Sequence, residues 1–187
     1  MIKMGVYAAT LSVLDENSNL NVEETIAHAE DIINQGLHGV FFFGSTGQSQ
    51  LISMAEKKEL VSKLPLSKLK KNFFLGTGFN SLNDNLEFIK YSMEYEFNTF
   101  LIMPPAYYKG NTEEGVFEFY TKIINNIPKV KIILYNFEKL SGFKFEPNFV
   151  KKLVSSYPKN IIGCKDSTYN LYDKIKIKDF LMFPGDE

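Results

Sequence analysis

The chain alternates short apolar runs with amphipathic stretches along its whole length. Seven runs have the composition of strands, and six intervening stretches have the period of helices. The predicted strands are Gly5–Val13, Gly39–Phe43, Asn72–Gly76, Thr99–Met103, Val130–Asn136, Asn160–Lys165 and Phe180–Phe183. The predicted helices are Val22–Gln35, Met54–Leu64, Ser81–Glu96, Thr112–Ile127, Glu146–Tyr157 and Tyr169–Ile177. Strict alternation of this kind predicts an α/β fold with a parallel sheet and right-handed crossovers.

Several helix starts carry their own signals. Asn21 is placed to cap the first helix, and Ser53 with Glu56 has the pattern of a capping box before the second. Pro147 stands in the first turn of the fifth helix, where its missing N–H costs little. These signals support the helix boundaries independently of the apolar period.

A doubly wound open sheet and a (β/α)8 TIM barrel both fit the alternation, and both bind ligands at the C-terminal ends of their strands. Polar residues follow the strands at Ser45, Thr46, Thr77, Tyr107, Tyr135, Lys165 and Asp186. Site-like residues after so many strands favour a barrel over a single crevice. A barrel needs at least about 200 residues, whereas this chain has 187. We therefore expect one incomplete barrel domain over residues 1–187, truncated after the seventh strand.

The composition excludes several classes of function. Lys and Arg number 21 against 22 Asp and Glu, which argues against a nucleic-acid partner. The single cysteine, Cys164, rules out an internal disulfide framework, and only two histidines, His28 and His38, argue against a metal centre. No apolar run has the length of a membrane span, and Met1–Thr10 lacks the pattern of a secretory signal. We expect a cytoplasmic protein with no metal and no membrane partner.

Lys165 is the sharpest chemical feature of the sequence. It follows the apolar run 161–164, so it is expected at the end of a buried strand. Desolvation there lowers the pKa of a lysine, and a neutral amine can attack a ketone to form a Schiff base. The alternative is a lysine that extends to the rim or pairs with Asp166.

Two further strand ends carry candidate groups. Tyr135 ends a strand, where its phenol could move a proton to or from a bound carbonyl, or simply cover the core. Residues 44–47 form a small, hydroxyl-rich turn whose N–H groups could hold a carboxylate or phosphate, although such turns are common in ordinary loops. Residues 76–78 lack the third glycine of a dinucleotide fingerprint.

Tyr107 and Tyr108 follow two prolines, which hold their loop extended. On a stiff loop the two rings could reach into a site or across a subunit interface. Both uses remain open at the level of the sequence.

Four segments, taken in order, resemble the family of pyruvate-dependent class I aldolases that includes N-acetylneuraminate lyase and dihydrodipicolinate synthase. Residues 44–47 resemble its pyruvate-carboxylate loop, and residues 104–108 its proline-tyrosine loop. Residues 134–136, followed by Ser141-Gly142, resemble its proton-relay segment, and residues 163–167 its Schiff-base lysine segment. The resemblance covers nearly the whole chain.

The resemblance implies a role for each matching residue. Lys165 would form the imine with pyruvate, and Tyr135 would relay the proton for cleavage or formation of the carbon–carbon bond. Ser45, Thr46 and Gly47 would hold the pyruvate carboxylate, and the Ser45 hydroxyl would connect Tyr135 to Tyr107 of a neighbouring subunit. The resemblance thus implies a homo-oligomer, a dimer or a tetramer. The implied partners are pyruvate and an aldehyde, with no cofactor.

Departures from the family pattern bear on the substrate. Leu140 stands where dihydrodipicolinate synthases carry an arginine, and residues 140–142 look more like N-acetylneuraminate lyase. Asp186 and Glu187 match an acidic pair that contacts sugar hydroxyls in those lyases. The first expectation is therefore a lyase acting on a 2-keto-3-deoxy sugar acid. The alternative within the family is 4-hydroxy-tetrahydrodipicolinate synthase, which condenses pyruvate with aspartate semialdehyde.

Two alternatives outside that activity remain. One is a non-catalytic truncated paralogue, because the closing strand and the family's C-terminal helical extension are absent from this sequence. The other is a phosphate-binding barrel enzyme that uses residues 76–78.

Overall fold

The computed structural model describes residues 2–185. They divide into two compact units, one made of Met1–Phe79 with Glu87–Asn98 and the other of Asn80–Leu86 with Thr99–Glu187. Helix α3 (Leu82–Glu94) starts in the second unit and ends in the first.

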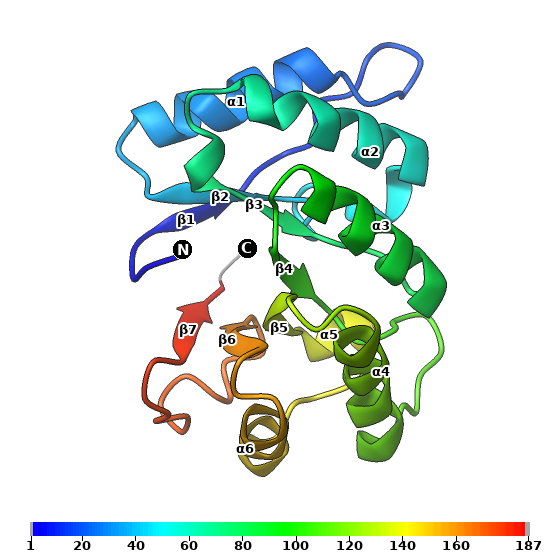
Figure 1. Ribbon diagram of the computed structural model, residues 1–187, viewed down its shortest axis with the longest axis vertical. Helices are drawn as coiled ribbons and strands as arrows, with labels where there is room; N and C mark the ends of the chain where they lie inside the picture. Colours follow the sequence, from blue (N-terminus) through cyan, green and yellow to red (C-terminus); the bar gives the residue numbers. More distant parts are fainter. Residues whose placement is uncertain (1, 186–187) are drawn as a thin grey trace. The chain divides into compact units, whose positions relative to one another are not determined.

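Three parallel strands form the sheet of the first unit, namely β1 (Tyr7–Ala9), β2 (Gly39–Phe42) and β3 (Phe73–Gly76). Ala8 pairs with Val40, and Phe41 with Phe74. Helices α1 (Val22–Asn34) and α2 (Met54–Lys63) lie side by side along one face of these strands (Figure 1). Short 3-10 turns occupy the connections at Ser49–Leu51, Leu64–Leu66 and Lys70–Asn72.

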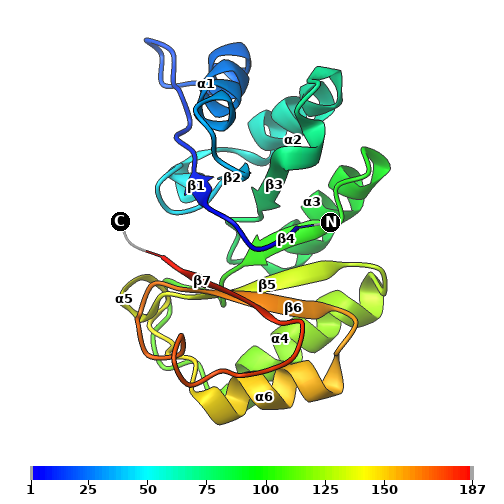
Figure 2. The same cartoon turned by 90° about the vertical axis from the view of Figure 1, so that its left-hand side faces the viewer.

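Four parallel strands form the sheet of the second unit, namely β4 (Thr99–Ile102), β5 (Lys131–Asn136), β6 (Ile161–Asp166) and β7 (Leu181–Pro184). Helices α4 (Glu113–Asn126) and α6 (Pro147–Ser156) lie on one side of β5 and β6 (Figure 2). The short helix α5 (Glu138–Ser141) follows β5.

Aromatic side chains fill the core of each unit. Every residue of β2 and β3 is buried, as expected of parallel strands covered on both faces. The rings of Phe42 and Phe73 meet edge-on with centroids 5.3 Å apart. In the second unit the ring of Phe145 packs at a tilt against that of Phe149 in α6, with centroids 5.7 Å apart.

The predicted helix starts are confirmed. The Asn21 side chain accepts a hydrogen bond from the N–H of Glu24, and Ser53 and Glu56 make both bonds of a capping box. Pro147 is the first residue of α6. The six predicted strands from Gly39–Phe43 onward are also present, and none of their ends is shifted by more than one residue.

The prediction of a strand over Gly5–Val13 is too long, since only Tyr7–Ala9 pairs with β2. The N–H of Thr10 still donates to the carbonyl of Phe41 in β2 at 3.2 Å, and the partners given for the next residues lie outside the strands. The Ser12 hydroxyl donates to the carbonyl of Gly47, and the N–H of Val13 donates to the Thr25 hydroxyl.

The prediction of a helix over Tyr169–Ile177 is wrong, because this segment is a loop with a single turn at its centre. Tyr169 has a φ of 59°, outside the helical region. The N–H groups of Leu171 and Tyr172 donate to the carboxylate of Asp166, so a side chain at the end of the preceding strand fixes the course of this loop. No helix within residues 2–185 has the length and apolarity needed to cross a membrane.

Candidate active site

Lys165 and Tyr135 meet at the C-terminal ends of β5 and β6. The two residues are directly opposite each other in the parallel register. Lys165 Nζ donates to the Tyr135 hydroxyl at 3.1 Å, and it lies 4.5 Å from the centroid of the same ring. Tyr135 is only 4% exposed, whereas Lys165 is half-buried. An amine and a phenol are thus in direct contact at a partly covered strand end.

Two small residues complete the surroundings of Lys165. A Cβ placed on Gly185 would lie 2.5 Å from Ser167 Oγ and 2.7 Å from Lys165 Cε, so a larger residue there would require these side chains to move. The Ser167 hydroxyl is buried and has no hydrogen-bond partner within the described part of the chain. We did not predict Gly185 or Ser167 as site residues, although each stands directly after a strand, where site residues are expected.

Cys164 lies next to Lys165 in sequence and is fully buried. Burial first, and the charge of Asp166 second, raise the pKa of its thiol well above the ordinary value. Such a thiol is a poor nucleophile, so Cys164 fits a packing role.

Ser45, Thr46 and Gly47 lie together in one turn after β2, within the first unit. The N–H of Gln48 donates to the carbonyl of Ser45 at 2.9 Å, and the Ser12 hydroxyl donates to the carbonyl of Gly47 at 2.6 Å. The non-glycine residues Phe43 and Gln48 bracket the turn with φ values of 59° and 50°. Left-handed backbone of this kind is costly and clusters at functional sites.

Tyr107 lies in the exposed loop between β4 and α4. It is 79% exposed, and its ring packs edge-on against Tyr108 with centroids 5.1 Å apart. The loop is held by Asn80, whose side chain accepts from the N–H of Ala106, and by Asn111, which donates to the carbonyl of Pro105. No described contact joins Tyr107 to Lys165 or Tyr135.

The remaining predicted residues make no described contact with Lys165 or Tyr135. Asp186 and Glu187, predicted to contact substrate hydroxyls, lie outside the described residues. Leu140 lies in α5 and is 39% exposed, and its carbonyl accepts a hydrogen bond from Lys109 Nζ at 2.9 Å. Within residues 2–185, no group of three or more His, Cys, Asp or Glu side chains is placed to hold a metal ion.

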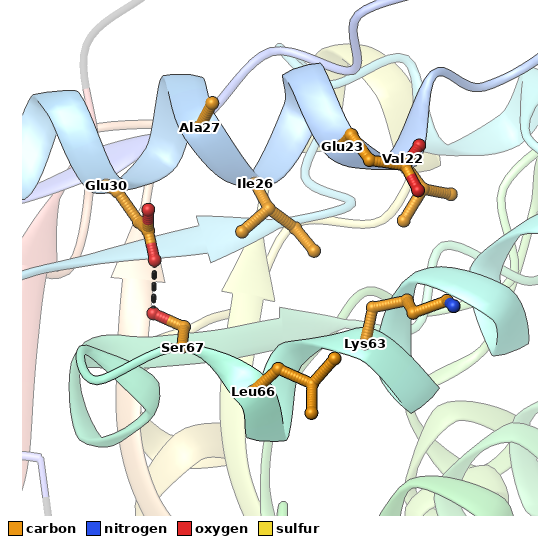
Figure 3. Close-up of a pocket in the computed structure, with 8 residues that line it drawn as sticks. All are labelled: Val22, Glu23, Ile26, Ala27, Glu30, Lys63, Leu66 and Ser67. Atoms are coloured by element: carbon orange, nitrogen blue, oxygen red, sulfur yellow. Dashed lines mark hydrogen bonds between the residues drawn. The ribbon is translucent and has the colours of Figure 1, made fainter.

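One cavity of the first unit lies between α1 and the chain that follows α2 (Figure 3). Its volume is about 360 Å³, and Ile26 and Leu66 give it an apolar lining. At one end the Ser67 hydroxyl donates to the carboxylate of Glu30 at 2.5 Å. The cavity lies among helices rather than at strand ends and contains none of the predicted site residues.

Comparison with known proteins decides the family. A family model described as the dihydrodipicolinate synthetase family matches residues 3–187. The chain belongs to the dihydrodipicolinate synthetase family. The family resemblance inferred from the four sequence segments is therefore confirmed.

Curated relatives in this family are named as synthases and aldolases. The 4-hydroxy-tetrahydrodipicolinate synthase of Methanococcus maripaludis is 30% identical over 176 residues, which are 94% of this chain and 60% of the relative. The L-threo-3-deoxy-hexylosonate aldolase of Aspergillus niger is 28% identical, over 90% of this chain and 52% of the relative. The chain therefore spans little more than half the length of these relatives.

A solved structure supports the fold. YagE of E. coli K12, a member of the dihydrodipicolinic acid synthase family determined in complex with pyruvate, matches with a TM-score of 0.77 and 25% identity. The match covers 87% of this chain and 54% of YagE. The fold is that of a truncated (β/α)8 TIM barrel, of which residues 2–185 supply seven parallel strands.

Proposed function

We propose that this chain carries the catalytic groups of a pyruvate-dependent class I aldolase, with Lys165 as the amine that forms the Schiff base. The observation that carries the proposal is the 3.1 Å contact between Lys165 Nζ and the Tyr135 hydroxyl at neighbouring strand ends. An amine that attacks a ketone needs a proton donor and acceptor within hydrogen-bond reach. Membership of a family of synthases and aldolases supports the same chemistry.

The proposed reaction begins with the neutral amine of Lys165. It attacks the carbonyl carbon of the keto acid, and loss of water gives an iminium ion that acts as an electron sink. In the cleavage direction a base removes the proton of the hydroxyl at C4, and the C3–C4 bond breaks to release an aldehyde. The remaining enamine takes a proton at C3, and water then releases pyruvate from Lys165.

Tyr135 is proposed to move the proton in these steps, since its hydroxyl lies against Nζ. The turn of Ser45, Thr46 and Gly47 is proposed to hold the carboxylate of the keto acid. Hydroxyls and N–H groups in a tight, strained turn are suited to an anion. Because this turn and Lys165 belong to different units, the role requires that residues 1–187 form one barrel domain, which is part of the proposal.

A 2-keto-3-deoxy sugar acid is the proposed substrate. The Leu140 side chain is apolar where the resemblance places the arginine that holds a second carboxylate, and the nearby amine of Lys109 already donates to the Leu140 carbonyl. Both features favour an uncharged aldehyde. The aldolase name of the Aspergillus niger relative supports this class of substrate. Asp186 and Glu187 are proposed to bind the sugar hydroxyls.

A second candidate is the condensation of pyruvate with aspartate semialdehyde. It is favoured by the name of the Methanococcus maripaludis relative, a 4-hydroxy-tetrahydrodipicolinate synthase. The two candidates share Lys165, Tyr135 and pyruvate, and differ only in the aldehyde.

We also propose a homo-oligomer, a dimer or tetramer located in the cytoplasm, in which Tyr107 serves the site of a neighbouring subunit. The support is the 79% exposure of Tyr107 on a loop held by Asn80 and Asn111. Light scattering gives the oligomeric state. Tyr107→Phe is expected to lower turnover only if the protein associates.

The function is tested by incubation with pyruvate and borohydride, followed by intact-mass measurement. A stable mass gain is expected in the unaltered chain and none in Lys165→Arg, whose guanidinium stays charged and forms no imine. Absence of any adduct in the unaltered chain would overturn the proposal. Release of pyruvate from a 2-keto-3-deoxy sugar acid then supports the first substrate, and condensation with aspartate semialdehyde the second.

A further inference from the structure

Behind Lys165 and Tyr135 lies a second, fully buried pair. Side chains alternate between the faces of a strand, so the residue after each site residue points to the opposite side. Those residues are Asn136 and Asp166, which are directly opposite each other in the register and have no exposed surface. Asn136 Nδ2 donates to Asp166 Oδ1 at 2.7 Å.

The buried carboxylate of Asp166 is satisfied by N–H groups. Besides Asn136, the N–H of Thr168 donates to Oδ1 at 3.3 Å. The N–H groups of Leu171 and Tyr172 donate to Oδ2 at 2.8 and 3.1 Å. No cation pairs with this carboxylate among residues 2–185. Burying a carboxylate without a counter-charge is expensive, so its hydrogen bonds must be retained if the segment is to keep this shape.

Asn136 extends the network to two other segments. Its Nδ2 also donates to Asn170 Oδ1 at 2.7 Å, and its Oδ1 accepts from the N–H of Phe145 at 3.1 Å. Asn170 Nδ2 in turn donates to the carbonyl of Phe145 at 2.9 Å. The network therefore joins the end of β5, the segment before α6 and the loop after β6. Each of these segments flanks the ends of the strands that carry Tyr135 and Lys165.

We propose that Asn136, Asp166 and Asn170 form a positioning network that holds Lys165 Nζ within reach of the Tyr135 hydroxyl. The inference rests on the proposed function for its catalytic consequence. The positioning of the two side chains does not depend on the proposed function, because the network fixes where two adjacent strands end relative to each other. A misplacement of about 1 Å at reacting groups costs about 100-fold in rate, so rigid support at this point has a large effect.

The test compares three single variants for the rate of borohydride trapping with pyruvate. In Asp166→Asn an NH2 group replaces one of the two carboxylate oxygens, so it faces an N–H group that needs an acceptor. We expect trapping to slow about 100-fold, as for a 1 Å misplacement. Asn170→Ala removes the outer, half-buried member, and a smaller loss of about 10-fold is expected on the same grounds.

Asn160→Ala is the matched control. Asn160 is also a buried asparagine, and its Nδ2 donates to the carbonyls of Pro128 and Val130 before β5 and β6 begin. Its loss is expected to lower the melting temperature while trapping stays within about twofold, because the reacting groups stay in place. If Asp166→Asn fails to fold, the test is decided by comparing the trapping rates of Asn170→Ala and Asn160→Ala.

A second readout separates this inference from the proposed function. The titration midpoint of the Lys165 amine is measured by NMR after reductive methylation with 13C-formaldehyde, with no keto acid present. We expect this midpoint to change in Asp166→Asn and Asn170→Ala and to be unchanged in Asn160→Ala. If the unaltered chain forms no adduct but this pattern holds, the proposed function fails and the positioning role stands. If the first two variants keep the midpoint, or if Asn160→Ala moves it equally, the positioning role is overturned.

Discussion

Lys57 and Lys165 lie at different depths in this protein and are held by different partners. Lys57, on α2, is fully buried, and its Nζ donates to the carbonyl of Thr77 at 2.8 Å. The same Nζ lies 3.8 Å from the centroid of the Phe79 ring and 5.5 Å from that of Phe43. Lys165 is less buried and contacts the hydroxyl of Tyr135.

Burial alone therefore does not identify a reactive amine. The carbonyl and the aromatic faces described next to Lys57 accept from its amine but give no proton in return, so these contacts hold the segment after β3 and offer no proton transfer. A phenol can both accept and donate a proton, so Lys165 has a partner for chemistry. The contacts of the amine, together with its place at a strand end, distinguish the two.

The largest expected effect is that of Lys165→Arg. Turnover of any keto acid should fall to background, because the covalent intermediate cannot form. Pyruvate release in a coupled assay measures it, with circular dichroism to show that the variant is folded. Residual turnover above background in a folded variant would place the reactive amine elsewhere.

Tyr135→Phe comes second. Removing a general acid–base group costs about 100- to 10,000-fold, so kcat should fall by this order while the pyruvate adduct at Lys165 still forms slowly. Steady-state kinetics and adduct trapping are measured on the same sample. An unchanged kcat would show that Tyr135 only covers the core.

Lys57→Met is expected to affect stability and not chemistry. The buried carbonyl of Thr77 loses its donor, which costs about 1–3 kcal/mol. Chemical denaturation measures the loss, and adduct formation at Lys165 should persist in the folded fraction. Loss of the adduct at full stability would give Lys57 a role in the reaction.

The smallest effect is expected of Glu56→Gln, next to Lys57. Burial raises the pKa of Glu56, but hydrogen bonds from Ser53 and Leu20 outweigh it and leave the pKa below its ordinary value. A lowered pKa contributes stability that is present above the unfolded value of about 4.5 and is lost as the pH falls through the folded value. Denaturation at neutral and acid pH should show a difference from the unaltered chain that shrinks as Glu56 is protonated. A difference that does not change with pH would contradict this assignment.

Much of the fold was predictable because the local signals agreed with the final structure. The apolar runs that became β2 and β3 are buried throughout, and the caps at Asn21 and Ser53 form as predicted. The loop after β6 was not predictable, because its N–H groups bond to the side chain of Asp166. The pattern of residues within a segment does not show that a side chain of the preceding strand will bind its N–H groups.

Some residues of the candidate site could be predicted from the sequence and others could not. Lys165 and Tyr135 were predictable because each follows an apolar run and is the last residue but one of its strand. Gly185, Ser167 and the Asn136–Asp166 pair were missed. Their importance lies in contacts across strands and loops, such as the 2.7 Å hydrogen bond from Asn136 Nδ2 to Asp166 Oδ1, which no single segment shows.

The most direct test of the account is peptide mapping of the chain after reaction with pyruvate and borohydride. The comparison of the two lysines predicts that the reduced adduct lies on the peptide containing Lys165 and that the peptide containing Lys57 is unmodified. An adduct on Lys57, or one spread evenly over surface lysines with Lys165 unmodified, would contradict the account.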